Sequence, residues 1–123
     1  MAVVIGVMAL DSIKTPFDER KQILGGGATY TGLSAALFSP TKIISRVGTN
    51  FPKAFFETLA LKNVDSTCVE VADGKTFEYE CEYDEFLYER KSLRTDLNVL
   101  TDFEPRLTER HAGEKMIFLS PLD

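Results

Sequence analysis

Short apolar segments that alternate with segments of helical spacing constrain the fold of this chain more than any other feature. Residues 3–10 are nearly all apolar, as are most of residues 42–47. Such runs are typical of strands that are covered on both faces of a parallel sheet. Helices are predicted over residues 28–38 and after Pro52, and residues 64–71 predict a third strand. This order predicts an α/β fold: a Rossmann-like parallel sheet with flanking helices and right-handed crossovers.

Single residues within the predicted helices also have expected positions. Tyr30, Leu33 and Leu37 share one stripe, which we expect to pack on the sheet while small neighbours allow close approach. Asn50 is the predicted cap of the second helix, and Asn63 is suited to its left-handed stop.

The hydrophobic period changes from that of helices to that of a one-sided strand at residues 76–83. Here aromatic residues and a cysteine alternate with glutamates, which we expect to form a solvated face: Phe77, Tyr79, Cys81 and Tyr83 against Glu78, Glu80 and Glu82. Residues 72–74 predict a hairpin turn, and residues 86–100 a returning strand. We therefore expect a small antiparallel flap outside the parallel sheet, with residues 116–119 forming a last buried strand.

Composition narrows the classes of partner. The net charge of the 123 residues is −5, which argues against a general nucleic-acid binder. The apolar start is interrupted by Asp11, too early for a membrane span, and it lacks the basic region of a signal peptide. Cys68 and Cys81 form no metal-binding spacing, and we expect reduced thiols in a cytoplasmic protein; a disulfide between them is the minor alternative.

Candidate site residues cluster where the predicted parallel strands end, which is where open α/β sheets bind ligands. Asp11 ends the first apolar run, and an ionised carboxylate can accept two hydroxyl donors, although it could equally bond to nearby backbone amides. Gly25-Gly26-Gly27 precedes the first helix. Because neither GxGxxG nor GxxxxGK[ST] is present, a flexible strand-to-helix turn is favoured over a phosphate loop, and a backbone wall for a polar substrate is a third option.

Other chemistry is not indicated by the sequence. The aromatic face of the flap could cover a pocket, form a dimer surface or pack on its own domain. No nucleophile and base are spaced as a pair, and His111 lies in a polar segment where we expect it to be solvated. We therefore predict no catalytic residue and no metal ligand in this chain.

Taken together, three segments and the flap resemble the N-terminal part of the ribokinase-like carbohydrate kinases, also called the phosphofructokinase-B type. The segments are VVIGVMALDSI, LGGGATYTGLSAALF and IISRVGTNFPKAFFETLALKNVD, followed by TFEYECEY. The resemblance implies one N-terminal portion of a ribokinase-like domain over residues 1–123, incomplete at its C-terminus, with lid segments at about residues 12–24 and 72–100.

The resemblance also implies an activity. The complete protein would transfer a phosphoryl group from ATP, with Mg²⁺, to a hydroxyl of a sugar, nucleoside or related small alcohol. Asp11, Gly25 and Gly26 match the acceptor-binding positions, and Phe77, Tyr79 and Tyr83 belong to the lid, through which ribokinase-like proteins can dimerise. Tyr30 stands where the family usually has a substrate-binding asparagine, and Lys53 replaces a glycine.

The family's Gly-x-Gly-Asp segment, which carries the catalytic aspartate and the anion hole, is absent from these residues, as is the ATP site. This chain would thus supply only the acceptor side and be inactive alone, with the remaining half on a longer or separate chain. Neither nucleic acid nor membrane is an expected partner. The alternative is a non-catalytic small-molecule-binding or assembly module of the same fold.

Overall fold

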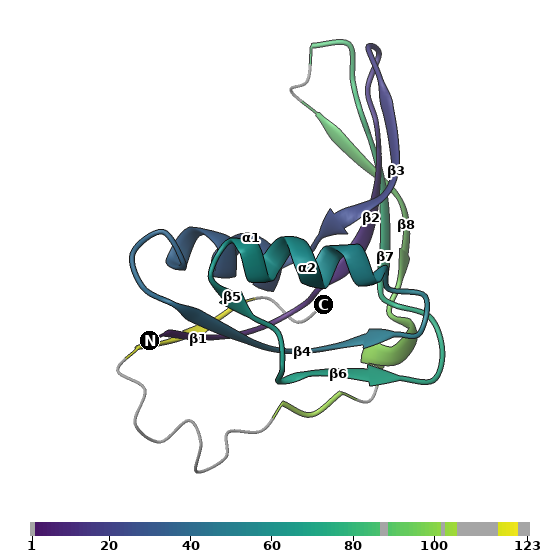
Figure 1. The fold of residues 1–123 in the computed structure, drawn as a ribbon. Coiled ribbons are helices and arrows are strands. Elements are labelled where there is room, and N and C mark those ends of the chain that lie inside the picture. The colour runs from purple at the N-terminus through teal and green to yellow at the C-terminus, as the bar shows by residue number, and fades with distance from the viewer. Residues whose placement is uncertain (1, 87–88, 102, 106–115, 121–123) are drawn as a thin grey trace.

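The computed structural model describes residues 2–86, 89–101, 103–105 and 116–120, and these form two sheets and two helices (Figure 1). The first sheet has the order β5-β4-β1-β9, and β6 also pairs with β4, farther along that strand. Every one of these pairs is parallel. The strands are β1 (Ala2–Ile5), β4 (Thr41–Gly48), β5 (Val64–Asp65), β6 (Val69–Ala72) and β9 (Met116–Leu119). The predicted parallel α/β sheet is therefore confirmed.

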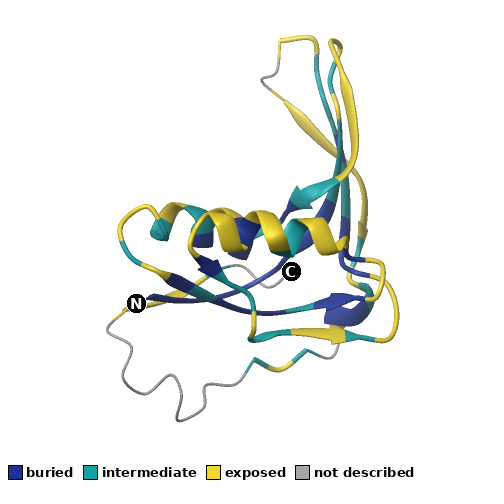
Figure 2. Cartoon of the chain, viewed as in Figure 1, coloured by how far each residue is buried: buried dark blue, intermediate teal, exposed yellow. Residues whose placement is uncertain are grey.

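Two helices, α1 (Gly27–Ala35) and α2 (Lys53–Leu61), cover one face of this sheet (Figure 1). Their inner sides meet the strands in one core cluster, in which Val4, Ile43 and Leu59 are fully buried. A Cβ atom at Gly32 would come within 2.8 Å of the Ile43 side chain, so α1 packs closely on β4. Figure 2 shows the same division, with buried strands beneath helices whose outer sides are exposed.

A second sheet projects from the carboxyl edge of the first, and we call it the projecting sheet (Figure 1). Its order is β3-β2-β7-β8, formed by β3 (Glu19–Gly25), β2 (Ala9–Lys14), β7 (Glu78–Tyr83) and β8 (Arg90–Asp96). The two outer pairs are antiparallel, but β2 and β7 run parallel, so the sheet is mixed rather than antiparallel. The predicted separate flap exists. It includes β2, the strand that carries Asp11, and the two strands paired with β2, β3 and β7.

The junction between the two sheets is a hydrogen-bond network around Thr76, which is fully buried. The Thr76 hydroxyl accepts a bond from the Gly48 N–H at 2.9 Å and donates to Asn50 Oδ1 at 2.8 Å. Asn50 Oδ1 also accepts the Thr76 N–H, and Asn98, at the start of the short 3₁₀ helix η1 (Asn98–Leu100), donates to the Thr76 carbonyl. Thr76 thereby fixes the base of β7 to the end of β4.

This network predicts a measurable loss of stability in Thr76→Val. The substitution keeps the shape but leaves the Gly48 N–H without its acceptor, so we expect the free energy of unfolding in urea to fall by about 1–3 kcal/mol. Thr58→Val is the matched control, because that hydroxyl is exposed on α2 and bonds only to the Ala54 carbonyl. A change within about 0.5 kcal/mol is expected there. Equal losses in the two variants would contradict the role given to Thr76.

Several local predictions differ from the structure at the start of the chain. The first apolar run is two strands, β1 and β2, because the chain leaves the parallel sheet at Gly6, where a Cβ would meet Ser120 at 2.7 Å. Asp11 consequently lies inside β2 rather than at the end of β1. Residues 72–74 do not form a hairpin turn, because β6 pairs with β4 and not with β7.

Helical and strand residues also differ in burial from the prediction. Tyr30 and Leu37 are 54% and 82% exposed, because α1 packs through its small residues instead. Asn50 does not cap α2, since its side chain bonds to Thr76, whereas Asn63 does have the predicted positive φ of 64°. The apolar strand β9 is exposed along its length, because its outer edge has no neighbour among the described residues.

The sequence predicted that Glu78, Glu80 and Glu82 form a solvated face, but Glu78 does not belong to one. It is buried, and its carboxylate accepts a bond from Arg94 at 2.9 Å and another from the Gln22 amide. His111 lies outside the described residues. No helix among the described residues is long and apolar enough to cross a membrane.

Candidate functional site

A pocket of about 490 Å³ lies where the N-terminus of α1, the segment before β2 and the projecting sheet meet. Its floor and sides are largely apolar, and a few polar groups converge on it, as is typical of small-molecule sites. The lining residues come from segments far apart in the sequence: Val7, Ala9, Asp11, Gly26, Gly27, Tyr30, Phe77, Tyr79, Arg90 and Thr95. We take this pocket as the candidate acceptor site.

The Asp11 carboxylate lies directly over the backbone of Gly25, where a Cβ atom would overlap it. Burial raises the pKa of Asp11 above its ordinary value, and a hydrogen bond from the Gly26 backbone opposes that rise. A carboxylate that has lost part of its hydration gains from hydrogen-bond donors supplied by a ligand. Asp11 is thus suited to accept bonds from the hydroxyl groups of a bound molecule.

The backbone at Gly26 has a conformation that only glycine adopts readily. Gly26 has φ 97° and ψ 151°, and a Cβ there would overlap the Val7 carbonyl oxygen. The same carbonyl accepts the Ala28 N–H at 2.9 Å, while the Thr29 hydroxyl bonds to the Gly25 carbonyl at 2.7 Å. These bonds hold the start of α1 against the segment that leads into β2, which brings the glycine turn beside Asp11.

Tyr30, in the first turn of α1, lines the same pocket as the Asp11 carboxylate. The pKa of its phenol is raised, first by partial burial and then by the negative charge of Asp11. Tyr30 therefore stays protonated at neutral pH and can donate a hydrogen bond. The helical stripe predicted that Tyr30 packs in the core. The structure instead places it in the wall of the pocket.

Two aromatic side chains, Phe77 just before β7 and Tyr79 within it, form another wall of the pocket. Phe77 is only 6% exposed and packs with Val7, Ala9 and Leu100. The Tyr79 hydroxyl lies 2.8 Å from the Ser92 hydroxyl, a contact across the β7–β8 ladder that fixes the ring.

The structure brings most of the sequence-predicted residues into one place. Asp11, Gly26, Tyr30, Phe77 and Tyr79 all line the pocket, and Gly25 lies beneath the Asp11 carboxylate. Tyr83 is farther along β7 and is not among the residues that line the pocket. Whether these residues bind an acceptor stays a prediction.

Sequence reasoning missed four lining residues, Val7, Ala9, Arg90 and Thr95. Arg90 stands directly across the ladder from Tyr83, and Thr95 from Tyr79. Knowledge of the register between β7 and β8 would have identified both residues, but the connection from Tyr83 to Arg90 is too long for the sequence alone to fix that register.

Cys81 lies between Tyr79 and Tyr83 but is not exposed as a nucleophile. Its side chain is buried, and burial raises the pKa of the thiol, an effect that the positive charge of Arg90 opposes. Cys68 and Cys81 are not joined by a disulfide, which was the minor alternative. A buried thiol of raised pKa is inert, so its contribution is to packing.

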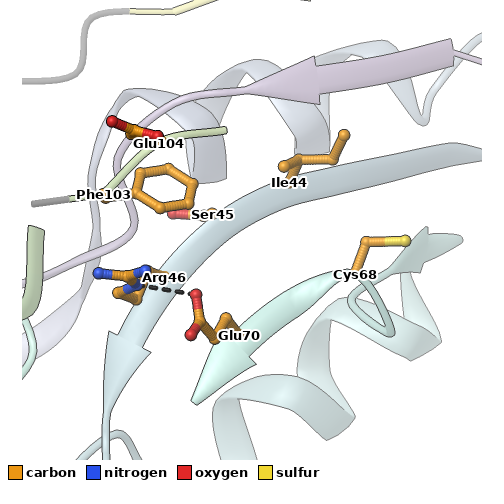
Figure 3. Close-up of a pocket in the computed structure, with 7 residues that line it drawn as sticks. All are labelled: Ile44, Ser45, Arg46, Cys68, Glu70, Phe103 and Glu104. Atoms are coloured by element: carbon orange, nitrogen blue, oxygen red, sulfur yellow. Dashed lines mark hydrogen bonds and ion pairs between the residues drawn. The ribbon is translucent and has the colours of Figure 1, made fainter. Parts of the chain in front are cut away.

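A second hollow, of about 400 Å³, lies beside β4 and β6 on the sheet face opposite the helices (Figure 3). Its charged residues already bind one another: Arg46 Nε donates to Glu70 at 2.8 Å, and the Arg46 guanidinium lies 5.2 Å from the Phe103 ring centroid. Arg46 also donates to the Val99 carbonyl. These contacts connect β4, β6 and η1, and they give the hollow a structural role.

Comparisons with known proteins agree with this architecture. The chain is 32% identical to the cytidine kinase of Thermococcus kodakarensis over 84 residues, which are 68% of this chain and 30% of that protein. The structure of ribokinase from Cryptococcus neoformans in complex with ADP matches 96% of this chain and 41% of its own, with a TM-score of 0.77 and 13% identity. The nucleoside kinase of Burkholderia thailandensis in complex with inosine matches 81% and 38%, with a TM-score of 0.70 and 13% identity.

These matches define a class of fold. The chain has the fold of the N-terminal part of the ribokinase-like kinases, so the resemblance drawn from its sequence is confirmed. No model of a known protein family matches it. The chain spans about a third of the length of the curated relative and about two fifths of the solved structures.

Proposed function

We propose that the complete protein transfers the γ-phosphoryl group of ATP to a hydroxyl of a nucleoside, sugar or related small alcohol, and that this chain supplies the acceptor site. The observation that carries the proposal is the pocket in which the half-buried Asp11 carboxylate faces aromatic walls. A polyol places its hydroxyl donors on the carboxylate and an apolar ring face on Phe77 and Tyr79. The similarity to kinases of nucleosides and ribose supports the same reaction class.

In this proposal each part of the pocket has a separate task. Asp11 holds the acceptor hydroxyls, and the Gly25-Gly26 backbone allows the ligand to approach closely. The projecting sheet acts as a lid that excludes water from the acceptor, which strengthens the hydrogen bonds inside the pocket. Phosphoryl transfer depends mainly on such positioning together with charge stabilisation.

ATP and Mg²⁺ are the expected cosubstrate and metal of the complete protein. Among the described residues, no group of three or more His, Cys, Asp or Glu side chains is placed to hold a metal ion. We propose that the nucleotide site and the catalytic base lie in the remainder of the protein. The assignment to the phosphofructokinase-B type stays a prediction. Dimerisation through the projecting sheet and a cytoplasmic location also stay predictions.

The test is a phosphoryl-transfer assay with the complete gene product, ATP and a panel of nucleosides and sugars, together with calorimetry of the same compounds without ATP. We expect one class to be phosphorylated and to bind in the calorimeter. A non-catalytic binding module of the same fold would bind the compound without consuming ATP. If no nucleoside, sugar or polyol is bound or phosphorylated, the proposed function is wrong.

A further inference from the structure

Arg90 is the first residue of β8, and its guanidinium lies at the wall of the acceptor pocket, 5.6 Å from the centroid of the Tyr79 ring. Because the Tyr79 ring is itself fixed by Ser92, the guanidinium rests on a defined platform. A guanidinium stacked on an aromatic ring keeps its N–H donors free at the rim of the ring plane. The arginine is therefore placed to donate hydrogen bonds into the pocket.

Arg90 differs from the other arginine of the same strand in having no ion pair among the described residues. Arg94 points to the opposite face of the projecting sheet and contacts three carboxylates: Glu78 at 2.9 Å, Asp96 at 3.4 Å and Glu80 at 3.8 Å. Glu78 and Glu80 of β7 thus pair with Arg94, whereas Arg90 lies on the pocket face. The five N–H donors of its guanidinium need hydrogen-bond acceptors when the site is closed to water.

The remaining lining restricts what that acceptor can be. Within the described part of the chain, Arg90 is the one cationic residue that lines the pocket, and the Asp11 carboxylate lines it too. A phosphate dianion would meet one positive and one negative charge there, which leaves most of its own charge uncompensated. A neutral group with two adjacent acceptor atoms matches the planar fork of arginine without this cost.

We propose that Arg90 is a specificity-determining residue that donates to a nucleobase edge on which a carbonyl oxygen and a ring nitrogen are adjacent, as in cytosine. Arginine makes the same paired contact with the O6 and N7 atoms of guanine. The ribose hydroxyls would then lie at Asp11, and the base would lie along Phe77 and Tyr79. This inference rests on the proposed function. It predicts that cytidine is preferred to adenosine, because adenine has no carbonyl oxygen and its amino group stands as a donor beside N1 and N7.

The test is calorimetry of the complete gene product with cytidine, adenosine, ribose and ribose 5-phosphate, each without ATP. We expect Arg90→Met to weaken cytidine binding about 10- to 100-fold, and to change adenosine and ribose binding by less than about threefold. Arg90→Lys keeps the charge but loses the planar fork, so it should recover only part of the cytidine affinity. Lys91→Met is the matched control, because it removes one positive charge from the adjacent position on the other face and should leave all four affinities unchanged.

The outcomes separate this inference from the proposed function. If the protein binds nucleosides but Arg90→Met weakens cytidine and adenosine equally, or neither, Arg90 does not recognise the base and only this inference fails. If the variant weakens ribose 5-phosphate alone, the guanidinium recognises a phosphate and the inference is again wrong. If the wild-type protein binds none of the four compounds, the inference and the nucleoside and ribose form of the proposed function are both overturned.

Discussion

Asp11→Asn is expected to weaken binding of the acceptor about 10- to 100-fold in the complete gene product, because each hydroxyl would lose a hydrogen bond to a charged partner. The amide keeps the size of the side chain and an acceptor oxygen for the Gly26 N–H, so the pocket itself should persist. The dissociation constant of the acceptor, measured by calorimetry without ATP, checks this prediction. An unchanged constant would remove Asp11 from the site.

The same substitution should raise the stability of the unliganded protein. Burial raises the pKa of Asp11 in the folded state, so the folded protein favours the protonated carboxyl more than the unfolded chain does. The stability that the protonated form provides is complete below the ordinary value of 3.8 and is lost as pH rises through the folded pKa. At neutral pH the neutral asparagine avoids this loss, and the unfolding midpoint should therefore rise. Below pH 3.8 the difference between variant and wild type should disappear.

Asp18→Asn is the matched control for both effects, since Asp18 lies in the turn between β2 and β3, away from the pocket. The pKa of Asp18 is lowered by a hydrogen bond from the Glu19 backbone and by Arg20. Its ionised form therefore favours folding, and its substitution should lower stability slightly and leave acceptor binding unchanged. If both variants shift the unfolding midpoint in the same direction, the burial of the Asp11 charge does not control stability.

The parallel sheet was predictable because the pattern of apolar residues within each short segment indicates a buried strand. Continuous apolar runs such as those of β1 and β4, with helices between them, admit few topologies. The break between β1 and β2 was not predictable, because the sequence stays apolar across it and the close approach of Ser120 to Gly6 comes from a distant part of the chain. The position of Asp11 inside the projecting sheet follows from that break.

The pocket was predictable in its residue types more than in its geometry. Asp11, the glycine turn and the aromatic alternation of β7 each indicated a ligand surface, and the structure brings them together. Arg90 and Glu78 could not be placed, since the register of β7 with β8 decides which charged residues meet. That register puts Arg94 beside Glu78 and leaves Arg90 on the pocket face, a choice that no spacing along the chain records.

Among substitutions that add one methyl group to the pocket, Gly26→Ala is expected to lower the stability of the folded protein most. The backbone of Gly26, at φ 97° and ψ 151°, lies in a region that only glycine adopts readily, at a cost of about 1–3 kcal/mol for other residues. The added Cβ would also overlap the Val7 carbonyl and come within 2.9 Å of the Ala9 nitrogen, both of them backbone atoms that cannot rotate away. Overpacking of this kind has a similar further cost.

We therefore expect the free energy of unfolding of Gly26→Ala in urea to fall by several kcal/mol, about 2–6 in total, which would leave little of the stability of a small domain. Gly27→Ala is the control: Gly27 is the first residue of α1 and lacks a positive φ, so alanine should be neutral or raise stability by up to about 1 kcal/mol. Similar losses at the two positions would show that the turn tolerates no side chain for some other reason. A loss confined to Gly26 would establish that its backbone conformation holds α1 and β2 together beside Asp11, and that the acceptor pocket depends on this one turn.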